Sequence, residues 1–121
     1  MTINSKYVAL KNYIPLGLPK EIDFEIKSRV LELNDENNIH VKNSWISVDP
    51  YMRARMTERK NYKPPFNLGE EMEGYAIGTV EQSNSNSFNR GDVVFSNYGM
   101  RDNFICNEKD LKKINPSNLP I

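Results

Sequence analysis

Short apolar segments, separated by turns rich in glycine, proline and polar residues, recur along the whole chain. Alternating apolar and polar positions are typical of strands with one buried face. We expect strands over residues 6–10, 24–33, 39–48, 74–81, 93–95 and 103–106. The second of these mixes its periods, which predicts a bulge or a short break within it.

One stretch in the middle of the chain, residues 51–59, has a helical pattern. Asp49 can cap this helix, and Pro50 suits its first turn, where the missing N–H of proline costs nothing. Asp49 and Arg53 stand four positions apart, a spacing that favours a local ion pair. Residues 108–113 predict one more helical turn, and residues 114–121 an extended end.

Together these elements predict a mainly β fold, a small barrel or sandwich with a few short helices. The chain contains no βαβ unit, and its six glycines never form the G-x-G-x-x-G pattern that cradles a pyrophosphate after a strand. A nucleotide phosphate site of that kind is therefore not encoded here.

Composition narrows the class of partner. The 121 residues suffice for one domain, and 16 basic against 16 acidic residues give a net charge of +0, which argues against a nucleic-acid binder. No apolar run approaches the ~20 residues of a membrane span, and residues 1–10 lack the apolar core of a signal peptide. We expect a cytoplasmic protein. With Cys106 and His40 as its single cysteine and histidine, a Cys/His zinc cage is excluded.

The segment WISVDPYMRARM (residues 45–56) carries a family resemblance. It resembles a signature of the zinc-independent medium-chain dehydrogenase/reductase superfamily, in the branch of NADP-dependent alkenal double-bond reductases and prostaglandin reductases (leukotriene B4 12-hydroxydehydrogenase-like). Further similar segments follow in the same order at residues 69–78, 88–94, 110–114 and 119–121. The resemblance thus covers essentially the whole chain.

This resemblance implies that residues 1–121 form an N-terminal GroES-like catalytic domain, a partly open β-barrel that holds the substrate. In the family a following Rossmann domain, absent from this chain, holds NADP(H). The implied reaction is reduction of the C=C bond of an enal, an enone or a quinone-like acceptor by hydride transfer. Zinc-dependent relatives have Gly-His-Glu where this chain has Gly69-Glu70-Glu71, and no cysteine stands near Asp49, so we expect no metal.

The resemblance also implies site residues. In these reductases the pair matching Pro50 and Tyr51 lines the nicotinamide end of the cofactor, and the tyrosine faces the substrate. A phenol, with a reference pKa of about 10, can donate a hydrogen bond to the carbonyl oxygen as an enolate forms, which gives Tyr51 a catalytic role. Alternatively, Tyr51 packs under the helix, and a tyrosine from the C-terminal half of relatives has that role.

Two more residues are candidates for substrate binding. Tyr75 matches a pocket tyrosine of some relatives, and the alternative is an aromatic side chain that covers one barrel face. Met52 lines either the pocket or the core.

The organisation of the protein leaves several alternatives open. Because the chain ends where the Rossmann domain of relatives begins, we expect a fragment, a truncated product or half of a split enzyme, inactive alone. A separate Rossmann chain or self-association could complete it. The alternative to an enzyme domain is a stand-alone GroES-like binding or assembly module, or a remnant without catalysis.

Overall fold

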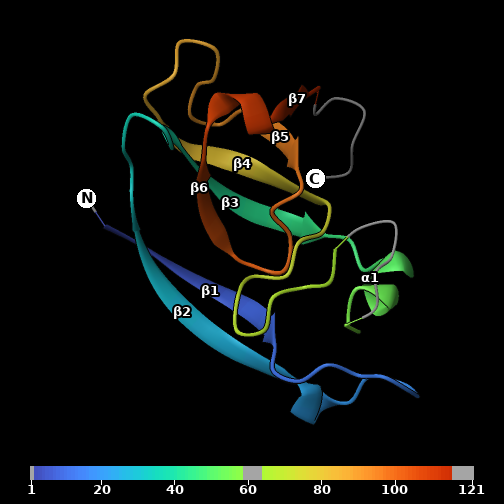
Figure 1. Ribbon diagram of the computed structural model, residues 1–121. Coiled ribbons are helices and arrows are strands. Elements are labelled where there is room, and N and C mark those ends of the chain that lie inside the picture. Colours follow the sequence, from blue (N-terminus) through green and yellow to red (C-terminus); the bar gives the residue numbers. More distant parts are fainter. Residues whose placement is uncertain (1, 59–63, 116–121) are drawn as a thin grey trace.

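The computed structural model describes residues 2–58 and 64–115, and strands dominate it (Figure 1). The strands are β1 (Thr2–Leu10), β2 (Phe24–Glu32), β3 (Ile39–Ile46), β4 (Ala76–Ser83), β5 (Val93–Ser96), β6 (Asn103–Cys106) and β7 (Lys112–Ile114). The helical elements are α1 (Tyr51–Ala54) and the two 3₁₀ turns η1 (Glu21–Asp23) and η2 (Glu108–Asp110). The predicted mainly β class is confirmed. None of the described helices is long and apolar enough to cross a membrane.

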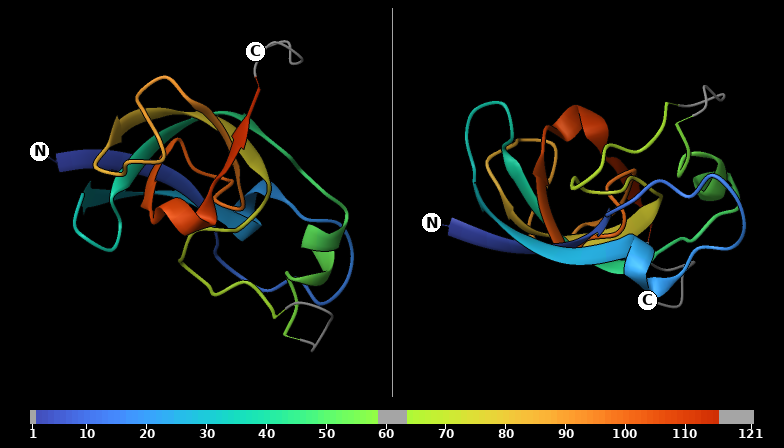
Figure 2. Two further views of the ribbon diagram at one scale, coloured as in Figure 1. Left: turned by 90° about the horizontal axis from the view of Figure 1, so that it is seen from above. Right: turned by 60° about the horizontal axis from the view of Figure 1, so that its bottom comes forward.

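The strands form two antiparallel sheets. One has five strands in the order β6-β3-β4-β5-β7, and the other is the β1–β2 hairpin. An isolated bridge between Tyr7 and Arg101 links β1 to the segment that leads into β6. This arrangement is compatible with the predicted partly open GroES-like barrel. In both views of Figure 2, α1 lies at the end of the barrel away from the N-terminus.

The bulge predicted for residues 24–33 is wrong. β2 pairs with β1 in an uninterrupted register from Thr2↔Glu32 to Leu10↔Phe24. Its periods are mixed because β2 is mostly exposed, with Ile26 at 78% and Val30 at 65% exposure, so burial does not impose an alternation. The register shifts lie in β3 instead, between His40 and Val41 and between Asn43 and Trp45.

The helix predicted over residues 51–59 is much shorter, because α1 ends at Ala54; residue 59 lies outside the described residues. The predicted Asp49 cap is wrong, since Pro50 is the N-cap and no side chain caps the turn. The predicted ion pair is wrong as well. The Arg53 guanidinium donates to the Gly17 carbonyl oxygen instead, from Nε at 3.2 Å and from Nη2 at 2.9 Å.

The C-terminal prediction holds in part. Residues 108–110 form the predicted turn as η2, whereas residues 112–114 continue as β7 against β5. Residues 116–121 of the predicted extended end lie outside the described residues.

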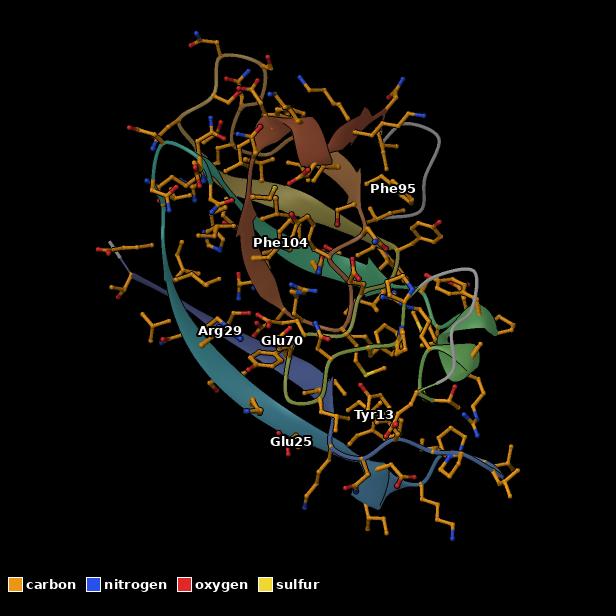
Figure 3. All side chains as sticks on the ribbon, viewed as in Figure 1. Tyr13, Glu25, Arg29, Glu70, Phe95 and Phe104 are labelled. Carbon is orange, nitrogen blue, oxygen red and sulfur yellow. The ribbon has the colours of Figure 1, made fainter. Side chains whose placement is uncertain are left out.

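Two clusters of buried side chains form the core. The first fills the five-stranded sheet side of the barrel and includes Ile39, Val41, Val80, Val94 and Phe104. The second lies under α1 and includes Leu10, Ile14, Met52, Phe66 and Met72. Figure 3 shows Phe104 pointing into the barrel, whereas Phe95 lies at its periphery. Phe104 therefore belongs to the buried core, whereas Phe95 lies on the exposed outer side of the barrel.

Cys106 provides a test of the first cluster. Its side chain is fully buried, and burial, with the nearby Asp110 charge, raises the pKa of its thiol to about 12. In the unfolded chain the pKa of this thiol is about 8.5. Because only the unfolded state ionises above that pH, this thiol lowers the free energy of unfolding progressively as pH rises through the alkaline range, and has no effect below it.

We therefore expect Cys106 of the native chain to react with a disulfide reagent at pH 8 no faster than the chain unfolds, and immediately in 8 M urea. Following the released chromophore at several urea concentrations measures this. Rapid reaction of the native thiol without denaturant would contradict the burial of Cys106.

Candidate functional site

The site begins where β3 ends and the chain turns into α1. The Ser47 amide donates to the Tyr75 carbonyl oxygen at 2.9 Å, and the Met52 amide donates to the Asp49 carbonyl oxygen at 3.0 Å. The first bond ties the turn to the segment before β4, and the second lies within the turn and starts α1. Gly74 lies close against Met52 there, so that a Cβ at this position would displace the terminal methyl group of the flexible Met52 side chain. The turn therefore sits directly beside Tyr75.

Three aromatic side chains from different elements form what we call the aromatic wall: Tyr51 of α1, Tyr75 before β4 and Phe95 of β5. The rings of Tyr51 and Tyr75 meet edge to face with centroids 6.2 Å apart, and those of Tyr75 and Phe95 stack at 5.4 Å. Tyr75 is 40% exposed and Phe95 37% exposed, so the wall is open to a ligand. An adjoining cavity of about 370 Å³ is lined by Trp45, Ile46, Ser47, Tyr75, Ile77 and Phe95.

Tyr51 is half-buried, and its hydroxyl oxygen is shielded from solvent. Burial and, next, the negative charge of Asp49 raise the pKa of this hydroxyl. The phenol therefore keeps its proton throughout the neutral range and can act as a hydrogen-bond donor.

The other predicted site residues take different places. Pro50 is exposed at the start of α1. Met52 is only 2% exposed and belongs to the second core cluster, beneath the turn. The structure thus brings Tyr51 and Tyr75 into contact and places Met52 in the core behind them. Their proposed roles in binding and catalysis stay predictions.

Phe95 of the aromatic wall and Trp45 of the adjoining cavity are two residues that the sequence analysis did not name as candidate site residues. Phe95 reaches the wall through the pairing of β4 with β5, in the register Ile77↔Phe95. Trp45 comes from β3, where Trp45 pairs with Ile77. Both side chains therefore flank one position of β4. Only the cross-strand register could have identified them.

The acidic residues of the 69–74 segment each bind a different neighbouring side chain. Glu73 forms an ion pair with the buried Arg55 at 3.0 Å, Glu71 pairs with Arg29 at 3.0 Å, and Glu70 accepts a hydrogen bond from Asn67. Within residues 2–58 and 64–115 there is no group of three His, Cys, Asp or Glu side chains that could hold a metal ion. Glu70 is thus engaged with a neighbouring amide.

Residues 6–114 match a protein family described as the N-terminal domain of oxidoreductase. The chain belongs to this family. The match covers most of the described barrel, including the aromatic wall. Together with the NADP-dependent relatives described next, this match confirms the resemblance to the NADP-dependent reductase branch of the medium-chain dehydrogenases/reductases.

Individual relatives of this oxidoreductase domain are described as NADP(H)-dependent reductases. It is 36% identical over 124 residues to the 2-alkenal reductase (NADP(+)-dependent) of Nicotiana tabacum, covering 98% of this chain and 36% of that protein. It is 31% identical to the NADPH-dependent curcumin reductase of Escherichia coli, covering 83% of this chain and 29% of that protein. The oxidoreductase domain therefore spans about a third of the length of these relatives.

A solved structure shows the same fold. The crystal structure of CurA in complex with NADPH from Vibrio vulnificus superposes with a TM-score of 0.79 at 28% identity, over 90% of this chain and 31% of that one. The oxidoreductase domain thus has the backbone arrangement of part of an NADPH-binding protein.

Proposed function

We propose that this chain is the substrate-side domain of an NADP(H)-dependent reductase that reduces the C=C bond of α,β-unsaturated carbonyl compounds. The observation that carries the proposal is the aromatic wall beside its cavity. A flat conjugated enone can stack on the exposed rings of Tyr75 and Phe95. The named substrates of the tobacco and Escherichia coli relatives, an alkenal and curcumin, support this chemical class.

In the proposed reaction, negative charge develops on the carbonyl oxygen of the substrate as its β-carbon receives a hydride. Tyr51 is the proposed catalytic residue: its neutral hydroxyl donates a hydrogen bond to that oxygen and stabilises the enolate. The raised pKa of Tyr51 supports this role, because the group remains a donor at neutral pH. Met52 supports the wall from the core behind it.

NADPH supplies the hydride when it is bound. The apolar side chains of Trp45 and Tyr75 suit a nicotinamide ring, and Pro50 and Tyr51 are the residues we assign to that end of the cofactor. The sequence contains no glycine-rich cradle for the phosphates. We therefore propose that a Rossmann domain, in the same protein or in a separate chain, holds the remainder of NADP(H), and that residues 1–121 serve as the GroES-like domain without zinc.

Titration of the ¹⁵N-labelled chain with benzylideneacetone, an enone that lacks charges, tests the substrate assignment. We expect amide shifts concentrated at Ser47, Tyr75 and Phe95, and an affinity about tenfold lower for Tyr75→Ala, because a stacking partner is lost. Val30→Ala, a truncation of an exposed side chain on β2, is the control and should bind like the parent chain.

The same samples test whether the chain alone can use NADPH to reduce the enone. We expect no steady oxidation of NADPH by the purified chain with this enone, because no phosphate contacts are encoded in it. Turnover by the chain alone, or amide shifts that avoid the aromatic wall, would contradict the proposal.

A further inference from the structure

Strand β2 has a single neighbour in the described part of the chain, β1, and its other edge is open (Figure 1). At the end of the β1–β2 ladder the Lys11 amide donates to the Asp23 carbonyl oxygen at 2.7 Å. Residues along an antiparallel strand turn their backbone groups alternately to one side and to the other. The odd-numbered residues of β2 therefore bond to β1, and the N–H and C=O groups of Ile26, Ser28 and Val30 point outward.

The far edge of β1 shows the same alternation. The Val8 amide donates to the Met100 carbonyl oxygen at 2.8 Å, and the Asp102 amide donates to the Lys6 carbonyl oxygen at 3.0 Å. Even-numbered residues of β1 thus bond away from β2, which leaves its odd-numbered residues for β2. Among the residues that the structure describes, none forms a hydrogen bond with the outward backbone groups of residues 26–30. These groups are therefore available to a further strand.

The open edge lacks several features that usually prevent strands from pairing. β2 spans nine residues, contains no proline and pairs with β1 without a bulge. Its two basic side chains already have acidic partners within the chain: Lys27 Nζ lies 3.6 Å from Glu25 Oε1, and Arg29 Nη2 lies 3.0 Å from Glu71 Oε1. Because these charges are balanced, the edge does not strongly repel a second strand.

The residue order of β2 suits a second copy of the same strand. Ile26 and Val30 are 78% and 65% exposed and stand two positions on either side of Ser28. An antiparallel pair of β2 strands centred on Ser28 overlaps along the whole strand and places each Ile26 beside the partner's Val30. Ser28 then lies opposite the partner's Ser28, in a pair whose backbone groups face one another. Lys27 faces the partner's Arg29, but each cation keeps the carboxylate of its own subunit.

Other two-fold registers are less favourable. A pair centred on Lys27 or on Arg29 places two identical cations directly opposite one another. A pair centred on Ile26 needs the Phe24 amide, which already donates to the Glu21 carbonyl oxygen. Registers centred nearer the ends of β2 also overlap over fewer residues. The register centred on Ser28 avoids these problems.

We propose that β2 is a homodimer interface, at which two copies of this chain pair their β2 strands about a two-fold axis through Ser28. The two β1–β2 hairpins then form one four-stranded sheet. This inference does not depend on the proposed function, because no residue of the aromatic wall lies on β2. Since the interface is only one strand wide, we expect weak association that increases with concentration.

Sedimentation equilibrium measures the association. We expect the average mass of the chain to rise from 14.0 kDa towards twice that value as concentration increases. Ser28→Pro should weaken the association at least about tenfold, because proline removes an outward N–H that only the partner strand uses. Ser28→Ala, which keeps that N–H, should associate like the parent chain.

Hydrogen exchange of individual amides locates the interface in the parent chain. In dilute samples the amides of Ile26, Ser28 and Val30 should exchange rapidly, whereas those of Lys27 and Arg29, which bond to β1, should be protected. In concentrated samples all five amides should be protected.

Disulfide cross-linking tests the register. With oxidised glutathione as the oxidant, Ser28→Cys should form a covalent dimer at least about tenfold faster than Ser87→Cys, the same change at an exposed loop residue. The reason is that directly paired Cα atoms lie about 5.5 Å apart, within reach of a disulfide. Cys106 does not interfere, because its side chain is buried.

Three results would overturn the proposal. The first is a mass that stays at 14.0 kDa at every concentration. The second is protection of the Ser28 amide in dilute samples, since another segment of the same chain would then cover the edge. The third is a dimer that Ser28→Pro leaves intact and whose amide shifts lie at Phe95, since the aromatic wall would then be the interface. Equal cross-linking of Ser28→Cys and Ser87→Cys would reject the axis at Ser28.

Discussion

Phe104→Ala should lower the free energy of unfolding by about 3–5 kcal/mol, the range for loss of a buried aromatic side chain. Phe104 is 2% exposed, points into the barrel from β6 and stacks on the ring of Tyr98 at a centroid distance of 4.6 Å and an angle of 7°. Truncation leaves a cavity in the first core cluster, and the rigid strands around it cannot close the gap. Tyr98 also loses its stacking partner.

Urea denaturation at 25 °C, followed by the fluorescence of Trp45, measures this effect as a lower midpoint at an unchanged slope. Val30→Ala is the control, because Val30 is exposed on β2, and it should change stability by no more than about 0.5 kcal/mol. A loss below about 1 kcal/mol for Phe104→Ala would show that this cluster is not the stabilising core.

The second large effect concerns Gly99, which approaches the backbone of the site. Its amide donates to the Gly74 carbonyl oxygen at 2.8 Å. A Cβ on residue 99 would lie 2.7 Å from that oxygen and 2.9 Å from its carbonyl carbon. Both atoms belong to the backbone, so no side chain can swing aside. We expect Gly99→Ala to cost about 3 kcal/mol, at the upper end for an overpacked position.

Gly99→Ala should also damage the site, because Gly74 directly precedes Tyr75 of the aromatic wall. At a temperature where the variant is folded, we expect weaker benzylideneacetone binding than in the parent chain. Gly91→Ala is the matched control: Gly91 has φ +94 but open space around it, so only strain of about 1 kcal/mol applies and ligand binding should be unchanged. Equal effects at both glycines would contradict the backbone contact.

Most of the strands could be predicted from the sequence because they have a buried face that imposes alternation. β1 is the clearest case, although the strand is predicted only from residue 6: Ile3, Ser5, Tyr7 and Ala9 are all buried, and the residues between them are not. β2 was assigned to the right place but given a bulge, since neither of its faces is deeply buried. The order of apolar and polar residues along a strand reflects which of its side chains are buried. Where few side chains are buried, this order says little about the strand's register.

The helix and its charges could not be predicted in the same way. The local spacing of Asp49 and Arg53 favours a pair, yet a loop more than 30 positions away in the sequence offers Arg53 the Gly17 carbonyl oxygen. A residue at a chain turn takes the partner that tertiary packing brings within reach, and a pair four positions apart contributes only a few tenths of a kcal/mol. The long-range contact therefore determines which group Arg53 binds.

Fold class and family could be read from the sequence, because they depend on residue types and their order along the chain; the roles of Tyr51 and Tyr75 stay predictions that the family resemblance implies. The folded chain was needed to show that Phe95 and Trp45 lie beside Tyr75. These contacts arise from the pairing of β3, β4 and β5, whose register is set by the packing of the whole barrel.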